Sequence, residues 1–320
     1  MPDYKTRPNS TNGRGYEDII ADEYNSLSTE HEKKFFLLSG LGTIHRVGMP
    51  SKLVQRSLAN MGILAEYTLL LKNLSGIVFE DNHKLNVRHE TYVRYLLTHI
   101  IEPELVQETI ISLLSAFSLY GFPFAKTAPK LEFSLYKATI NHKFLFEVLK
   151  GRESLIIDLY KTLEKSYELD GLFLLQYGLA LRDLHKHAYA LEKLEAACVA
   201  YKMDHTEHAL AKQLFINGLE FKDKIKAYAY LERAKEILQR LDKTINSDDT
   251  YPFVTLAEGH TQLVMEYEGV EPAKAIAKNY VKELKIRADR RPTEQRLNDS
   301  WQRLFKFATT GAWNSVDNND

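Results

Sequence analysis

The chain has little of what secreted and membrane proteins depend on. Its 320 residues include one cysteine, Cys198, which excludes an internal disulfide and suits a reducing compartment. The N-terminal stretch MPDYKTRPNSTNGRG lacks the apolar core of a signal peptide. Apolar runs such as Leu172–Leu175 are far shorter than the ~20 residues that a membrane span needs. We therefore predict a cytoplasmic protein that makes no membrane contact.

Proline and glycine are also scarce, and the charges nearly cancel. Only 9 Pro and 15 Gly are present, and because these residues interrupt helices, their scarcity favours a helical fold. The formal net charge of −1 argues against a nucleic-acid or membrane footprint over the whole chain. A local basic patch is still compatible with it.

Recognisable catalytic motifs are missing as well. A phosphate-binding loop needs Gly-Lys-Ser/Thr, whereas Gly40–Gly42 lies in a helical pattern without the following lysine. Zinc takes three or four ligands, and the histidine pairs His185/His187 and His205/His208 are more typical of polar surface turns. No Gly-x-Ser-x-Gly elbow is present. We therefore predict a chain that is not an enzyme and that holds no cofactor or metal.

What the sequence does contain is a pair of helices with small residues at a regular spacing. Residues 172–201 read as two antiparallel helices, with Gly178 in the first and Ala190, Leu194 and Ala197 in the second. This spacing matches the tetratricopeptide (TPR) repeat, in which a small residue of the first helix admits the alanines of the second. The stretch therefore predicts one unit of a repeat array.

The same signature recurs further along the chain. Ala227, Leu231 and Ala234 have the same offsets, about one repeat length later. A third helix pair within residues 253–288 matches less well, and a last helix over residues 292–308 would close the array. We therefore expect a short TPR-like solenoid.

The region before these repeats predicts a different unit. Three helices, the last two over residues 50–60 and 64–74, precede the β-branched and aromatic segment Ile77–Phe79. The turn residues Asp81-Asn82 and the alternating segment Lys84–Arg88 follow, which indicates a β-hairpin. Three helices followed by a hairpin are the layout of a winged helix, and we expect no other β structure.

A winged helix that ends in Leu85-Asn86-Val87-Arg88-His89-Glu90, followed by helices and TPR-like repeats, resembles the C-terminal half of STAND-type P-loop ATPases. The resemblance is to bacterial members of antiphage defence, in which a sirtuin-like or nuclease effector precedes the ATPase. In that family an Arg-His pair, matched here by Arg88-His89, opens the helix after the last wing strand. The ATPase core and effector would then lie upstream or in a partner, and the chain would be a fragment, a split-gene partner or a separate adaptor.

Together these patterns predict a mostly all-α fold in which a winged helix with one β-hairpin is followed by a helical linker and a TPR-like α-solenoid. The expected segments are a disordered leader (1–15), the winged-helix domain (16–100), the helical linker domain (101–166), the TPR-like repeats (167–308) and a flexible tail (309–320).

Two sets of residues are candidates for binding. Aromatic side chains on a solenoid are natural anchors for a protein partner, although packing between the repeats would account for most of them. The candidates in the repeats are Tyr177, Tyr189, Tyr201, Tyr228 and Tyr230. The candidates in the winged helix, for contact with DNA or with another domain, are Lys52, Arg56, Lys84, Arg88 and His89.

The function predicted is non-catalytic protein–protein recognition and regulation, as implied by the resemblance. The winged helix would dock on an ATPase or effector module, and the repeats would sense a partner such as a phage protein. The alternative is a DNA-binding winged-helix regulator with a TPR sensor. The apolar run Leu69–Leu71 in the third helix favours docking, because bases are read mainly by Arg, Asn and Gln side chains.

Overall fold

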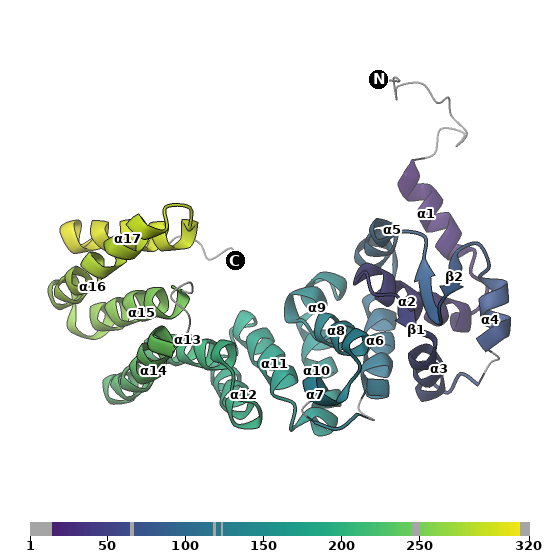
Figure 1. The fold of residues 1–320 in the computed structure, drawn as a ribbon, viewed down its shortest axis with the longest axis horizontal. Helices are drawn as coiled ribbons and strands as arrows, with labels where there is room; N and C mark the ends of the chain where they lie inside the picture. The colour runs from purple at the N-terminus through teal and green to yellow at the C-terminus, as the bar shows by residue number, and fades with distance from the viewer. Residues whose placement is uncertain (1–14, 65–66, 118–119, 123, 245–249, 314–320) are drawn as a thin grey trace, which may run out of the picture. The chain divides into compact units, whose positions relative to one another are not determined.

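The computed structural model describes residues 15–64, 67–117, 120–122, 124–244 and 250–313. This part of the chain is mostly helical and carries a small antiparallel sheet, which confirms the predicted mostly-α class with a β-hairpin (Figure 1). Contacts divide the chain into two compact units, residues 1–170 and 171–320. The predicted leader and tail lie outside the described residues, apart from Gly15 and residues 309–313. Within the described ranges, no helix is both long and apolar enough to cross a membrane.

The first unit contains ten α-helices among its described residues. They are α1 (Tyr16–Asn25), α2 (Glu30–Ile44), α3 (Ser51–Asn60), α4 (Tyr67–Asn73), α5 (Glu90–Tyr95), α6 (Pro103–Phe117), α7 (Phe124–Thr127), α8 (Lys130–Thr139), α9 (His142–Val148) and α10 (Glu153–Tyr167). A π-helical turn (Leu96–Ile100) continues α5. The strands are β1 (Met49–Pro50), β2 (Val78–Asp81) and β3 (Lys84–Val87).

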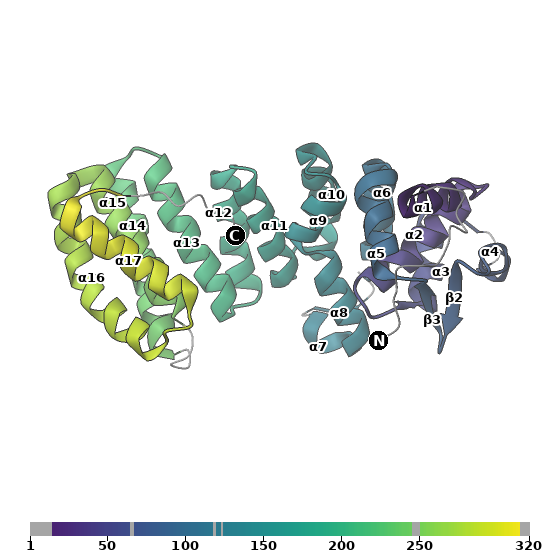
Figure 2. The ribbon, with the colours of Figure 1, turned by 90° about the horizontal axis from the view of Figure 1, so that it is seen from above.

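The three strands form one antiparallel sheet in the order β1-β3-β2, with β2 and β3 as the predicted hairpin (Figure 2). Val78 pairs with Val87, and the turn residues Asn82 and His83 have φ values of 50° and 60°. Two successive positive φ angles are those of the type I′ turn, whose twist matches that of a hairpin. The third strand, β1, was not predicted, because two residues ending in proline carry no strand pattern.

Two glycines of α2 allow neighbouring elements to approach its backbone. A Cβ at Gly40 would lie 2.9 Å from a methyl carbon of Val93 in α5. A Cβ at Gly42 would lie 2.2 Å from the backbone nitrogen of Met49 in β1. The chain reaches β1 through Gly48, which has a φ of +67° and donates its amide to the carbonyl of Gly42 (3.1 Å). Gly40 and Gly42 are therefore needed for the close packing of α5 and β1 on α2.

Buried tyrosines connect the helices that follow the sheet. Their hydroxyls all donate hydrogen bonds within the unit: Tyr136 to the Asp170 carboxylate (3.0 Å), Tyr160 to the Ile140 carbonyl (2.8 Å) and Tyr167 to the Leu114 carbonyl (2.6 Å). Helix α6 also packs on α2 and α3. Residues on both sides of position 100 thus share one unit, and a separate linker domain stays a prediction.

The second unit is a succession of helices. They are α11 (Gly171–Asp183), α12 (His187–Ala200), α13 (Asp204–Glu220), α14 (Lys224–Thr244), α15 (Tyr251–Glu268), α16 (Val270–Arg290) and α17 (Gln295–Thr310). Each helix packs on the next, and α11, α13, α15 and α17 also pack on one another in that order. We call these four helices the first layer of the unit.

The small residues singled out in the sequence lie at these helix contacts. The alanines at most 1% exposed include Ala190, Ala197, Ala227, Ala234, Ala273 and Ala277. A Cβ on Gly178 in α11 would lie 2.7 Å from Cγ of Leu194 in α12. The first helix pair can therefore pack this closely only because position 178 has no side chain.

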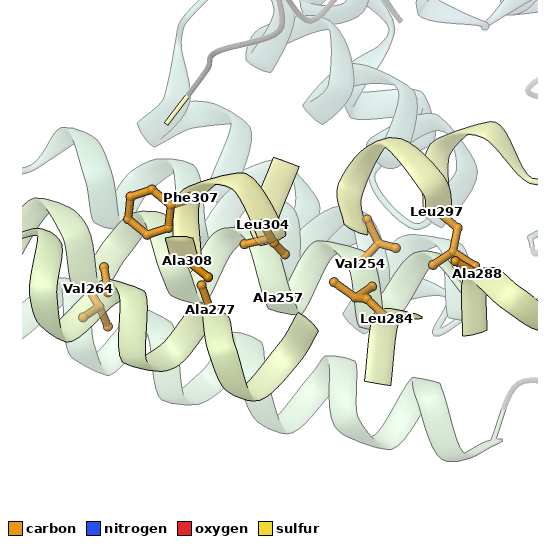
Figure 3. Packing of buried hydrophobic residues seen from close by; sticks show 11 residues of the cluster. Val254, Ala257, Val264, Ala277, Leu284, Ala288, Leu297, Leu304, Phe307 and Ala308 are labelled. Carbon is orange, nitrogen blue, oxygen red and sulfur yellow. The ribbon is translucent and has the colours of Figure 1, made fainter. Parts of the chain in front are cut away.

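An apolar cluster holds α15, α16 and α17 together at the end of the array. Figure 3 shows Val254, Leu284 and Leu297 gathered in one part of the cluster, and Phe307 near Ala277 in another. These residues come from all three helices and are buried. Helix α17 therefore covers α15 and α16, as expected of a helix that closes the array.

The Gly42→Ala variant should unfold more easily than the wild type by about 3 kcal/mol, because the added methyl group meets backbone rather than a movable side chain. Equilibrium urea unfolding of the full chain, followed by far-UV circular dichroism, measures the loss. Gly121→Ala is the control, since its methyl group would be 3.8 Å from Thr127, an ordinary contact. Equal stability of the two variants would contradict the proposed packing.

Candidate functional site

The tyrosines predicted to bind a partner do not share one environment. Tyr177 is only 3% exposed and packs near Phe173, with the Lys193 ammonium 5.7 Å from its ring centre. Its assignment as an exposed anchor is therefore corrected, since it belongs to the interior between α11 and α12. Tyr189 is 63% exposed and lies on α12.

The other three tyrosines are partly buried. Tyr201 and Tyr230 have intermediate exposure. Tyr228 donates a hydrogen bond to the Glu268 carboxylate (2.6 Å), and the Lys224 ammonium lies 5.6 Å from its ring centre. Burial, followed by this hydrogen bond, raises the pKa of Tyr228 to about 12. Of the five, Tyr189 is thus the most accessible to a partner.

In the region predicted to be a winged helix, Arg88 and His89 have structural partners. Arg88 donates to the carbonyl of Gly76 (2.8 Å) and forms an ion pair with Glu23 of α1 (3.2 Å). His89 is exposed and caps α5, its Nδ1 accepting a hydrogen bond from the Thr91 amide (3.2 Å). The Arg-His pair therefore opens this helix, where the sequence placed it.

The remaining candidate cations of this region lie on α3 and β3. Lys52 and Arg56 are both exposed on α3, and Lys84 is half-buried. Helix α4, the third helix of the predicted motif, exposes Leu69 (51%). In β2, Phe79 is 49% exposed.

A polar stripe on the first layer of the second unit was not predicted. His208 of α13 hydrogen-bonds Thr255 of α15 through Nε2 (2.9 Å). Arg303 of α17 donates to Glu258 of α15 (3.1 Å), while its Nε is buried without a partner among the described atoms. The stripe therefore runs across three helices that are distant in the sequence.

Lys212 of α13 interacts electrostatically with Glu258 of this stripe. It is half-buried on α13 and forms no ion pair or hydrogen bond with any described residue. Burial lowers the pKa of Lys212, and the charges of Arg182 and Arg296 lower this pKa further. Asp183 and Glu258 oppose the shift without reversing it. Burial and like charges thus disfavour the positive charge of Lys212. A cation in such surroundings is a candidate for binding an anionic group.

The sequence carried one signal for this stripe. Arg182 stands in the last turn of the largely apolar helix α11, and Lys212 lies among the apolar residues Leu210, Ala211 and Leu214 of α13, but periodicity does not show which faces of the two helices meet. Among the residues that the structure describes, no three His, Cys, Asp or Glu side chains converge as metal ligands would. Cys198 is half-buried, and burial raises the pKa of its thiol.

Comparison with known proteins adds no relative. No family model matches the chain, and neither a curated protein nor a solved structure shows significant similarity to it.

The Lys212→Met variant should stabilise the second unit by about 1 kcal/mol, because it removes a poorly compensated buried charge. The folded pKa of Lys212 lies below its unfolded value, so the unfolded chain binds more protons at alkaline pH. Wild-type stability should consequently gain from Lys212 as the pH rises towards 10.5, and this gain should be absent from the variant.

Tryptophan fluorescence during urea unfolding measures this effect specifically, because the two tryptophans, Trp301 and Trp313, both belong to the second unit. Lys278→Met, at an exposed position of α16, is the control and should leave stability nearly unchanged. A marked loss of stability in Lys212→Met would show that the lysine is a structural residue.

Proposed function

We propose that the chain is a non-catalytic recognition and regulatory module that acts as the C-terminal part of a STAND-type defence ATPase does. The segment from α2 to β3 would be a winged helix that docks on the ATPase module in the cytoplasm. The helices α11–α17 would be a TPR-like array that senses a protein partner. The observation that carries the proposal is the exposure of two large apolar side chains, Leu69 on α4 and Phe79 on β2.

Support for the winged helix comes from the order of elements. Helix α2 is followed by β1, α3, α4, β2 and β3, and β3 lies between the other two strands. A helix that reads DNA presents polar side chains to the groove, and its wing presents cations to phosphates. Here Leu69 and Phe79 are exposed, and the wing carries the exposed carboxylates Glu80 and Asp81. This chemistry fits a protein surface better than a polyanion.

Support for a sensing array comes from the second unit. Its helix pairs meet through small residues, and its first layer carries charged groups that are not fully paired, above all Lys212 and Arg303 Nε. Stacked helix pairs offer continuous binding surfaces of this kind. A partner with acidic groups would complete the interactions that these cations lack.

Docking is tested with the P-loop ATPase or effector encoded beside this gene. The two proteins are co-expressed, and the affinity of the purified pair is measured by calorimetry. Leu69→Asp and Phe79→Asp should each weaken binding at least tenfold, because a carboxylate would be buried in an apolar interface. Leu169→Asp, at another exposed leucine of the same unit, should change it less than twofold. Equal losses in all three variants, or no complex, would overturn the docking role.

The alternative, DNA binding, rests on the exposed cations Lys52 and Arg56 of α3. If they contact phosphates, binding to duplex DNA measured by fluorescence anisotropy should fall steeply with salt. The Lys52→Ala/Arg56→Ala variant should then bind more weakly and show a smaller salt slope. We expect instead only weak binding that these substitutions leave unchanged; a steep slope lost in the double variant would favour the DNA-binding regulator.

A further inference from the structure

A cleft of about 500 Å³ opens on the first unit, away from α4 and the wing residues. It is lined by His45 at the C-terminal end of α2 and by residues on or beside α5, α8 and α9. All four helices belong to the first unit. A volume of this size accommodates a small organic ligand. Phe144, a residue of α9, contributes an aromatic wall that meets the ring of His45 edge-on, with the ring centres 4.6 Å apart.

The charges of the cleft are predominantly positive. Arg94, Lys137 and Lys143 line it from three different helices, and Glu147 is its one carboxylate. Arg94 forms an ion pair with Glu147. Lys137 and Lys143 are exposed and form no ion pair with the described part of the chain. The lining therefore has two positive charges in excess, which a dianionic ligand would neutralise.

Neutral hydrogen-bonding groups accompany these charges. The side-chain oxygen of Asn141 accepts a hydrogen bond from the Phe144 amide (3.1 Å), which caps α9 and leaves the Asn141 NH₂ group as a donor for a ligand. Nε2 of His45 is buried and has no partner among the described atoms. A site for a hydrogen-bonding ligand would contain such a group, a buried nitrogen without a partner in the wall of a polar cleft.

The state of His45 is set by its surroundings. Burial, followed by the charge of Arg94, lowers the pKa of His45 to about 4, so its imidazole is neutral near pH 7. A neutral imidazole has one N–H donor and one acceptor nitrogen, and it can therefore bond to a ligand without adding to the charge of the cleft.

We propose that this cleft binds a small phosphomonoester. Its dianionic phosphate would be held by Lys137 and Lys143, while Arg94 stays paired with Glu147, and its organic part would occupy the space beside Asn141 and His45. A phosphate matches both the excess charge and the donor set, and ammonium and guanidinium groups are its usual partners in proteins. This site is independent of the docking and sensing surfaces proposed above.

The test uses the full chain and calorimetric titration with AMP, inorganic phosphate and adenosine. AMP should bind and adenosine should not, because only AMP carries the dianion. In the Lys137→Ala/Lys143→Ala variant, the affinity for AMP should fall at least tenfold, since hydrogen bonds to charged groups are lost. Lys161→Ala/Lys165→Ala, two exposed lysines of α10 in the same unit, is a control of equal net charge and should change the affinity less than twofold.

The remaining outcomes also decide the question. Binding of inorganic phosphate that is lost in the Lys137→Ala/Lys143→Ala variant would show that the phosphate group is what the cleft recognises. A change in the imidazole resonances of His45 on addition of AMP, assigned with His45→Asn, would place the ligand beside that ring. Equal affinity for AMP and adenosine, absence of AMP binding, or equal losses in both double-lysine variants would overturn the proposal.

Discussion

Close approach of helix backbones through positions without large side chains is the constraint on which both units depend. In the second unit, Gly178 leaves the space that Leu194 of the next helix fills. In the first unit, Gly42 leaves room for the backbone of Met49 and so fixes the start of the sheet. Because interiors are packed nearly as densely as crystals, a single methyl group at such a position has to displace its neighbours.

This packing also decides where buried charge is found. Each helix of the first layer in the middle of the second unit is covered by its pair partner and by neighbours of the same layer, so few of its positions reach solvent. Lys212 occupies such a position, and Arg303 on the last helix is half-buried with its Nε unpartnered among the described atoms, although burial of a charge without full pairing costs stability. The fold therefore contains a local conflict between stability and charge, and conflicts of this kind are concentrated at functional sites.

Local patterns in the sequence were enough to predict the helix pairs and the hairpin. The recurring alanines mark helix contacts, and the alternation in Lys84–Arg88 marks a strand with one buried face. What could not be predicted depends on which elements meet. Tyr177 and Tyr189 are both tyrosines of the same helix pair, yet one is interior and the other exposed. Strand β1 likewise exists only because β3 is there to pair with it.

Which elements meet also determines which side chains are free to bind. Residue type alone therefore does not decide between DNA and protein as the proposed partner of the first unit. Arg88 has the charge for a phosphate contact, but Glu23 pairs with it and the carbonyl of Gly76 accepts its Nε–H. A phosphate would have to replace both partners, leaving a carboxylate close to the nucleic acid. Leu69 and Phe79 face no such competition, because exposed apolar side chains gain from any surface that removes them from water. The energetic balance at these residues therefore supports the proposed docking on a protein.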